Sequence, residues 1–117
     1  MIFNVSSSLS ALMAFGKKMG VIANNVANVY SEGFKKSRAN LEEGYNGGVS
    51  VEINRIETPG HSVTMEKYNE IIHKEGSNVY LAEEISQAQI IRRYYQADLQ
   101  SIKIQDEMLG DFLDIMG

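Results

Sequence analysis

The stretch that decides the fold is SLSALMAFGKKMGVIANNVANVY, residues 8–30. Its bulky apolar residues follow one another at alternating steps of three and four, the spacing of a single helix face. This seam consists of Leu12, Phe15, Met19, Ile22, Val26 and Val29. No proline interrupts the stretch, and the serines at positions 6–8 are N-cap candidates. We therefore predict one helix over residues 8–30.

A second stripe of small residues lies beside this seam on the helical wheel. It consists of Gly16, Gly20, Ala23 and Ala27. Small side chains at such spacing allow another backbone to approach closely. The neighbouring lysines, Lys17 and Lys18, argue against a transmembrane interpretation of the GxxxG pattern.

Residues 78–116 predict a second, longer helix with the same spacing. Its seam runs through Leu81, Ile85, Ala88, Arg92, Tyr95, Leu99, Ile102, Asp106, Leu109, Leu113 and Met116. A second apolar stripe contains Ile90, Tyr94, Ala97, Ile104, Met108 and Ile115. A helix that is apolar on two sides needs more than one neighbour to cover it. A chain of this length has no third long helix, so neighbouring subunits are the expected source.

The segment between the helices is rich in glycine and has a different periodicity. Val49, Val51 and Ile53 alternate with polar residues, as do Val63 and Met65, and the turn signal Thr58-Pro59-Gly60 stands between the two runs. We predict a β-hairpin or a short pair of strands joined at that turn. Residues 66–75 fit a helix and a loop equally well.

The expected fold is mainly α with a small β element, in one domain over residues 1–117. It divides into an N-terminal helix (1–30), a turn-rich middle with a β-hairpin (31–76) and a C-terminal helix (77–117). We expect the terminal helices to pack as an antiparallel coiled-coil hairpin. Periodicity alone favours a closed or dimeric hairpin and a polymer subunit about equally, because apolar stripes usually form ordinary cores.

Composition excludes several classes of function. The 117 residues contain no cysteine, which rules out disulfides, thiolate nucleophiles and zinc–thiolate sites. The net charge of −4 argues against nucleic acid as a partner. Residues 1–40 contribute +4 and residues 41–117 contribute −8, so opposite parts of two subunits could attract each other. No apolar run approaches the roughly 20 residues that span a bilayer, so we expect no membrane insertion. Residues 1–5 lack the basic and apolar regions of a secretory signal.

No constellation of residues predicts catalysis, a metal site or a cofactor. The two histidines, His61 and His73, stand near turns without carboxylates at metal-ligand spacing, and we interpret them as surface residues. Lys35, Lys36 and Arg38 form a basic cluster that suits a solvated loop or an acidic neighbouring subunit better than phosphate. We therefore expect a protein that is not an enzyme and has no cofactor.

Two motifs at opposite ends of the chain point to a family. IANNVANVYSEGFKKSR, residues 22–38, resembles the N-terminal signature of bacterial flagellar axial proteins, and SNVYLAEEI, residues 77–85, with the residues that follow it, resembles their C-terminal signature. The matching positions are Ala23, Asn24, Asn25, Ala27, Asn28, Gly33, Phe34, Lys35, Asn78, Val79, Glu84, Arg93 and Tyr95.

The asparagines of the first motif also have a physical interpretation. Asn24 and Asn28 lie one helical turn apart, and asparagine is unfavourable inside a helix but favourable near its end. On residue chemistry alone, a solvated, frayed helix end explains these asparagines better than a binding role does, and the resemblance reverses that preference. Gly33 is expected to adopt a positive φ in the exit turn, with Phe34 anchoring that turn to a core.

The resemblance implies a structural subunit of the flagellar basal-body rod, which spans the periplasm. It implies polymerisation with itself and other axial proteins, after passage through the flagellar type III export apparatus. The compact middle is most similar to a proximal rod protein. Tyr30, Tyr94 and Asp98 depart from the family pattern, which leaves a diverged paralogue or a stand-alone helical adaptor as alternatives. The predicted packing residues are Leu12, Phe15, Met19, Ile22 and Val26 against Ile85, Tyr95, Leu99, Ile102 and Leu109.

Overall fold

The computed structural model describes residues 5–45 and 47–117. Helix α1 spans Val5–Ala27 and helix α2 spans Leu81–Met116. Four strands lie between them: β1 (Ser37–Glu43), β2 (Val49–Arg55), β3 (Ser62–Lys67) and β4 (Glu70–Glu75). The prediction of a mainly α chain with a small β element is confirmed. Residues 1–4, which belong to the predicted N-terminal helical segment and to the stretch considered as a signal, lie outside the described residues.

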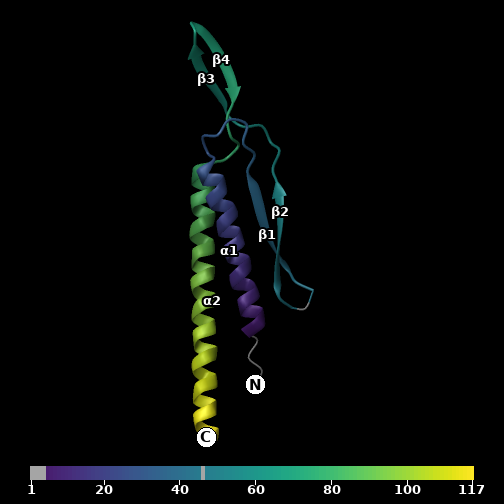
Figure 1. Cartoon of the computed structure of the whole chain (residues 1–117), viewed down its shortest axis with the longest axis vertical. Helices are drawn as coiled ribbons and strands as arrows, with labels where there is room; N and C mark the ends of the chain where they lie inside the picture. The colour runs from purple at the N-terminus through teal and green to yellow at the C-terminus, as the bar shows by residue number, and fades with distance from the viewer. Residues whose placement is uncertain (1–4, 46) are drawn as a thin grey trace.

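The two helices lie side by side and run in opposite directions (Figure 1). Near the start of α1, Ser8 accepts a hydrogen bond from Gln105 at 3.5 Å. Further along, the rings of Phe15 and Tyr94 are 6.0 Å apart. Near its end, Asn25 donates to Glu84 at 3.2 Å. The residue numbers of the contacts thus rise along α1 and fall along α2, so the two helices are antiparallel.

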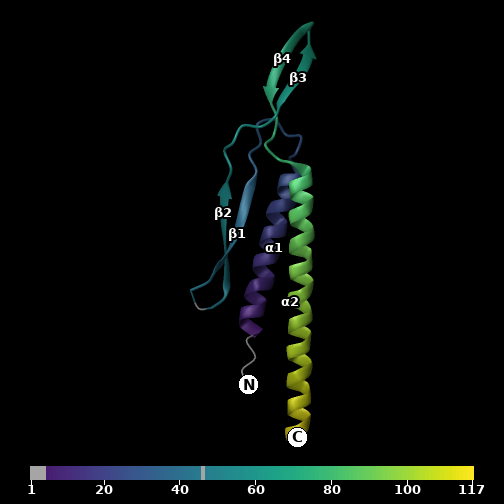
Figure 2. The ribbon, with the colours of Figure 1, turned by 180° about the vertical axis from the view of Figure 1, so that it is seen from behind.

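Helix α1 is the middle layer of the molecule. Strands β1 and β2 contact α1, and α2 packs beside the same helix (Figures 1 and 2). The molecule is long and thin, 82 × 24 × 16 Å. The first turn of α1 and the end of α2 lie toward one end of the long axis, and the β3–β4 hairpin forms the other end.

The predicted strand pairing is wrong. The run containing Val49 and Val51 pairs with β1, in the register Leu41↔Val51. The run containing Val63 and Met65 pairs with β4, the segment whose sequence fitted a helix or a loop. Thr58-Pro59-Gly60 therefore connects two hairpins instead of closing one. Alternation identifies a strand but carries no information about its partner, because pairing depends on contacts between distant residues.

The helix boundaries also differ from the prediction. Helix α1 begins at Val5, so the serines at 6–8 lie inside its first turns, and it ends at Ala27. The N–H of Asn28 is shared between the carbonyls of Asn24 and Asn25, as is common at a helix terminus. The chain then leaves through Gly33, whose φ is +65° as predicted. Helix α2 begins at Leu81, because the residues before it are held in an extended, buried segment.

Candidate assembly interface

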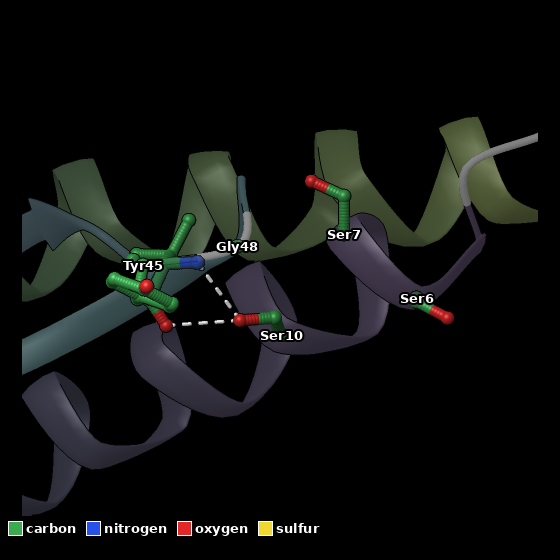
Figure 3. Close-up of a pocket in the computed structure, with 7 residues that line it drawn as sticks. Ser6, Ser7, Ser10, Tyr45 and Gly48 are labelled. Carbon is green, nitrogen blue, oxygen red and sulfur yellow. Dashed lines mark hydrogen bonds between the residues drawn. The ribbon is translucent and has the colours of Figure 1, made fainter.

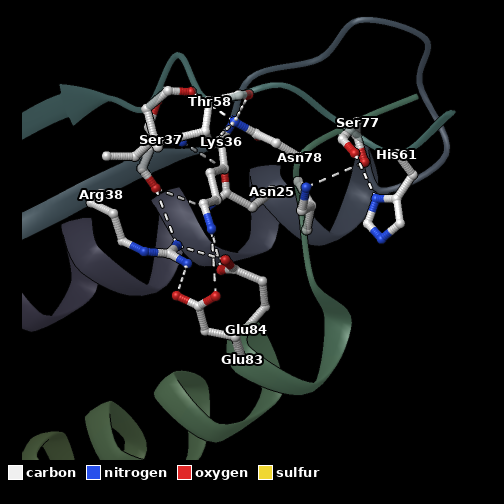
Figure 4. Close-up of polar contacts among 12 residues, drawn as sticks. Asn25, Lys36, Ser37, Arg38, Thr58, His61, Ser77, Asn78, Glu83 and Glu84 are labelled. Atoms are coloured by element: carbon white, nitrogen blue, oxygen red, sulfur yellow. Dashed lines mark hydrogen bonds and ion pairs between the residues drawn. The ribbon is translucent and has the colours of Figure 1, made fainter. Parts of the chain in front are cut away.

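A polar junction holds the upper end of the helix pair against β1 (Figure 4). Side chains reach it from α1, from the segment around β1, from the extended segment before α2, and from the first turn of α2. Three of these side chains stand at matching motif positions and are fully buried: Asn25, Asn78 and Glu84. Buried polar groups must be hydrogen-bonded to be tolerated, and this junction satisfies that condition.

Asn25 joins α1 to the start of β1 and to α2. Its Oδ1 accepts from the Ser37 backbone N–H at 3.0 Å, and its Nδ2 donates to the Ser37 carbonyl at 2.9 Å. The same Nδ2 donates to Glu84 at 3.2 Å. An amide carries both a donor and an acceptor, so this one side chain satisfies both backbone groups of Ser37. That requirement explains an asparagine at a position facing inward.

Asn78 plays the matching role on the other side of the junction. Its Oδ1 accepts from the Lys36 backbone N–H at 2.7 Å. Its Nδ2 donates to the carbonyls of Ile56 and Thr58 at 2.8 and 3.0 Å. The extended segment before α2 is thereby hydrogen-bonded to the residue just before β1 and to residues just after β2. The neighbouring Val79 is also buried and adds an apolar contact.

Glu84 is a carboxylate with no solvent exposure, and its charge is balanced by Arg38. Arg38 Nη1 donates to Glu84 Oε1 at 2.6 Å, and Nη2 donates to Glu83. Burial by itself lowers the pKa of Arg38, but the hydrogen bonds to Glu84 and Glu83 raise it above its ordinary value. The hydrogen bond from Arg38 lowers the pKa of Glu83. Both carboxylates lie in the first turn of α2, where negative charge also favours the helix dipole.

The interpretation of Lys35, Lys36 and Arg38 as a solvated cluster is wrong. Each of these cations pairs with an acid of the same chain: Lys35 with Glu75, Lys36 with Glu83, and Arg38 with Glu83 and Glu84. The pair with Lys35 and a hydrogen bond from the Gly60 N–H lower the pKa of Glu75. The sequence does show two adjacent acids, Glu83 and Glu84, that could pair with these cations. They are more than 40 residues away along the chain, so no local pattern indicates the ion pairs.

The lower end of α1 is fastened to the β1–β2 hairpin by a serine (Figure 3). Ser10 Oγ accepts from the Val49 N–H at 2.8 Å and donates to the Val49 carbonyl at 2.9 Å. Ser7 Oγ donates to the Gly47 carbonyl at 3.1 Å. A Cβ at Gly48 would lie 2.8 Å from Ser10 Oγ, so this close approach requires glycine. Ser7, one of the predicted N-cap serines, thus contacts the β1–β2 hairpin.

The face of α2 toward α1 is unexpectedly polar. The α2 residues that are not exposed are Glu84, Gln87, Ala88, Ile91, Asp98, Ile102 and Gln105. Buried oxygen atoms of Asp98 and Gln105 have no hydrogen-bond partner among the described residues, and burial raises the pKa of Asp98. Helix α2 therefore places polar groups against its own α1 while keeping many of its apolar residues outside.

The predicted packing residues divide between the two sides of this contact. On α1, Ile22 is buried, and Leu12, Phe15, Met19 and Val26 are partly buried. On α2, Ile102 is partly buried, but Ile85, Tyr95, Leu99 and Leu109 are exposed by 37–48%. Their packing between subunits stays a prediction. The second apolar stripe of α2, including Ile90, Tyr94, Ile104 and Met108, is exposed as well.

The remaining motif residues lie mostly at the surface. Ala23, Asn24, Ala27, Gly33 and Arg93 are exposed, and Asn28 and Phe34 are partly buried. Asn28 Nδ2 donates to the Asn24 carbonyl at 2.9 Å and its Oδ1 accepts from Ser31, which closes the exit turn. The small-residue stripe of α1 faces outward, and a Cβ at Gly16 or Gly20 would meet no atom within 4 Å.

The described residues contain no group of three or more histidine and carboxylate side chains arranged to hold a metal ion. Within that same part of the chain, neither helix combines the length and apolar character needed to cross a membrane. His61 instead contacts its surroundings through Nδ1, 3.2 Å from the Ser77 carbonyl, and through the ring of Tyr80 at 4.9 Å.

The geometry is that of an elongated pair of antiparallel helices with a fixed upper junction and exposed apolar helix faces. Residues 6–35 match the model of a protein family described as flagella basal body rod protein. The match confirms the resemblance to flagellar rod proteins over these residues, which include most of the first motif. That family is structural, and its members are components of the flagellar basal body. No curated protein matches the sequence.

Proposed function

We propose that this protein is a structural subunit of the flagellar basal-body rod that polymerises through its terminal helices. The family match over α1 supports the rod assignment. The observation that carries polymerisation is the exposure of large apolar side chains along the whole of α2, from Leu81 to Met116. Exposed apolar surface on this scale marks an interaction site, and one partner helix cannot cover stripes on different sides.

In the proposed assembly, α1 and α2 of each subunit form an antiparallel coiled coil. The exposed stripes of α2 pack on helices of neighbouring subunits, and the small-residue face of α1 allows those helices to approach closely. The subunit reaches the axis through the flagellar export apparatus and meets itself and other axial proteins there. No step of this function requires catalysis or a cofactor. The compact middle segment suits a proximal position in the rod.

The test replaces Leu99, which is 44% exposed, by aspartate. Leu99→Asp removes an apolar contact from the proposed interface without touching the buried core, so we expect normal folding and export but loss of motility and truncated basal bodies. Gln100→Asp, on the exposed neighbouring position, is the matched control and should swim normally. Full motility of Leu99→Asp, in a strain that is immotile without this protein, would contradict the helix-packing proposal.

The second candidate is a helical adaptor that binds one partner through the same exposed face, as a diverged paralogue of the rod proteins. The exposed stripes of α2 suit one partner of complementary surface as well as several copies of the chain. Sedimentation distinguishes the two functions. An adaptor forms a complex of fixed mass at saturation, whereas a rod subunit continues to add copies as its concentration rises.

A further inference from the structure

The β3–β4 hairpin lacks support from the rest of the chain. It projects from one end of the molecule, and neither strand packs against another described helix or strand (Figures 1 and 2). Its link to the body is at its base, where the Glu75 carbonyl accepts from Gly33 and Lys74 lies 3.4 Å from Glu32. An isolated two-stranded hairpin is marginally stable in water unless a further surface packs on it. The hairpin therefore needs a contact that a single copy does not provide.

The two faces of this hairpin differ in character. The register Met65↔Ile72 and Val63↔Lys74 places Val63, Met65 and Ile72 on one face, because directly opposite residues share a face. The other face carries Ser62, Glu66, Glu75, the Thr64–His73 hydrogen bond and a single apolar residue, Ile71. The unsupported hairpin thus has one apolar face available for packing.

The apolar face continues into a cavity at the base of the hairpin. Val63 is shared between the two, and the cavity, of about 360 Å³, is otherwise lined mainly by Val29, Tyr30 and Val79. Lys74 lies on the same face as Val63, and Lys67 lies further along it, opposite Glu70. The surface is therefore apolar at its centre and carries two lysines and one acid, Glu70, for a net positive charge.

The opposite end of the molecule presents a surface of complementary character. The last turns of α2 have no other described element beside them and expose Phe112, Leu113, Ile115 and Met116. Residues 104–117 contain four acids and no basic residue, and Asp111 and Asp114 lie among these apolar side chains. The molecule is 82 Å long, so this surface and the hairpin cannot meet within one copy.

We propose that the end of α2 of one copy docks on the apolar face of the β3–β4 hairpin and its basal cavity in the next copy, head to tail. Phe112 and Ile115 would cover Val63, Met65 and Ile72, and Asp111 and Asp114 would lie near Lys67 and Lys74. Such a contact joins different surfaces of identical subunits, so it propagates an open chain along the long axis. The inference rests on the proposed function, since it supplies an axial contact for the polymer.

The absence of native cysteine makes a crosslinking test selective. The double variant Met65→Cys with Ile115→Cys can form a disulfide only between copies, because a disulfide needs Cα atoms within about 7 Å. Oxidation of assembled protein should give a ladder of multimers on a non-reducing gel. The control double variant, Thr64→Cys with Ile115→Cys, places the first cysteine on the opposite face of the same strand and should give no ladder. Circular dichroism checks that both variants keep the helical content of the unmodified chain.

Each outcome decides the matter. A ladder that depends on position 65 supports head-to-tail docking. A single crosslinked dimer overturns it, because it shows a closed, reciprocal contact. Large assemblies without the position 65 crosslink overturn this docking site while leaving the proposed rod function intact. A chain that stays monomeric at all concentrations overturns both.

Discussion

The two ends of the helix pair are stabilised in opposite ways. At the upper end, Asn25, Asn78 and Glu84 are fully buried, and their polar groups are bonded within the chain. Toward the lower end, Asp98 and Gln105 face α1 with unpaired buried oxygens, and the apolar residues of α2 lie outside. The polar groups of the upper end are satisfied in a single copy, whereas the lower end leaves apolar side chains exposed that the proposed assembly would cover. Contacts within the chain therefore concentrate at one end of the helix pair, and the surface available for the proposed assembly lies toward the other.

The largest effect is expected from breaking the upper junction at its buried ion pair. Arg38→Ala leaves the Glu84 carboxylate buried without its cation, which typically costs about 3–5 kcal/mol of unfolding free energy. Urea denaturation followed by circular dichroism measures the loss. Arg55→Ala removes an arginine from the exposed pair with Glu57 and should cost less than about 1 kcal/mol. Equal losses in the two variants would contradict the distinction between the junction and the surface.

A smaller effect is expected from the junction amide. Asn25→Ala leaves the Ser37 N–H and carbonyl without their amide partner, and because Ser37 is only partly buried we expect a total loss of about 1–3 kcal/mol of unfolding free energy. Asn24→Ala, at the adjacent exposed motif position, should change stability by less than about 0.5 kcal/mol. The same denaturation experiment applies. Equal losses of stability at both positions would contradict the assignment of the stabilising role to the buried Asn25 amide.

The smallest effect, with the opposite sign, is expected at the lower end. Asp98→Asn removes a charge that burial disfavours and should stabilise the helix pair at neutral pH by about 1 kcal/mol. Burial raises the pKa of Asp98, so the folded state holds the proton more tightly than the unfolded state. Stability of the unmodified chain therefore falls as pH rises from the ordinary aspartate pKa of about 3.9 to the raised value.

The pH dependence provides the control for that prediction. The advantage of Asp98→Asn over the unmodified chain should disappear below about pH 3.9, where Asp98 is protonated in both states. Glu83, whose pKa is lowered by Arg38, contributes a pH dependence of opposite sign but is present in both chains and cancels in the difference. Asp106→Asn, at an exposed position of the same helix, should show no such pH-dependent gain. A constant advantage at all pH values would mean that charge is not the cause.

Sequence periodicity did not predict the contacts between residues that are far apart in the chain. The spacing predicted both helices and identified Val49–Arg55 and the run around Val63 as extended, but it paired them with each other. Each strand has two edges of similar hydrogen-bonding capacity, so the partner is decided by which segments the fold brings close. In the same way, Glu83 and Glu84 are 45 or more residues from Arg38, and no local pattern shows that they meet.

The sequence pattern also did not predict which side of α2 packs against α1. Alternating steps of three and four describe several overlapping stripes on this helix, and the longest apolar one includes Ile85 and Leu99, which are exposed in the single chain. The buried stripe includes Asp98 and Gln105 because the junction at Glu84 fixes the rotation of α2 about its axis. A hydrophobic pattern indicates which residues are to be buried, but it does not indicate whether they pack against the same chain or against another one.

Local sequence patterns predict the two long helices, the glycine-rich middle with extended segments, the positive φ at Gly33 and the resemblance to the flagellar axial proteins, because helix period, turn chemistry and motifs are local properties. The strand partners, the ion pairs of Lys35, Lys36 and Arg38, the side of α2 that faces α1 and the unsupported β3–β4 hairpin became known from the three-dimensional fold. These features arise from contacts between residues far apart in the chain, whose energies depend on which groups are buried together.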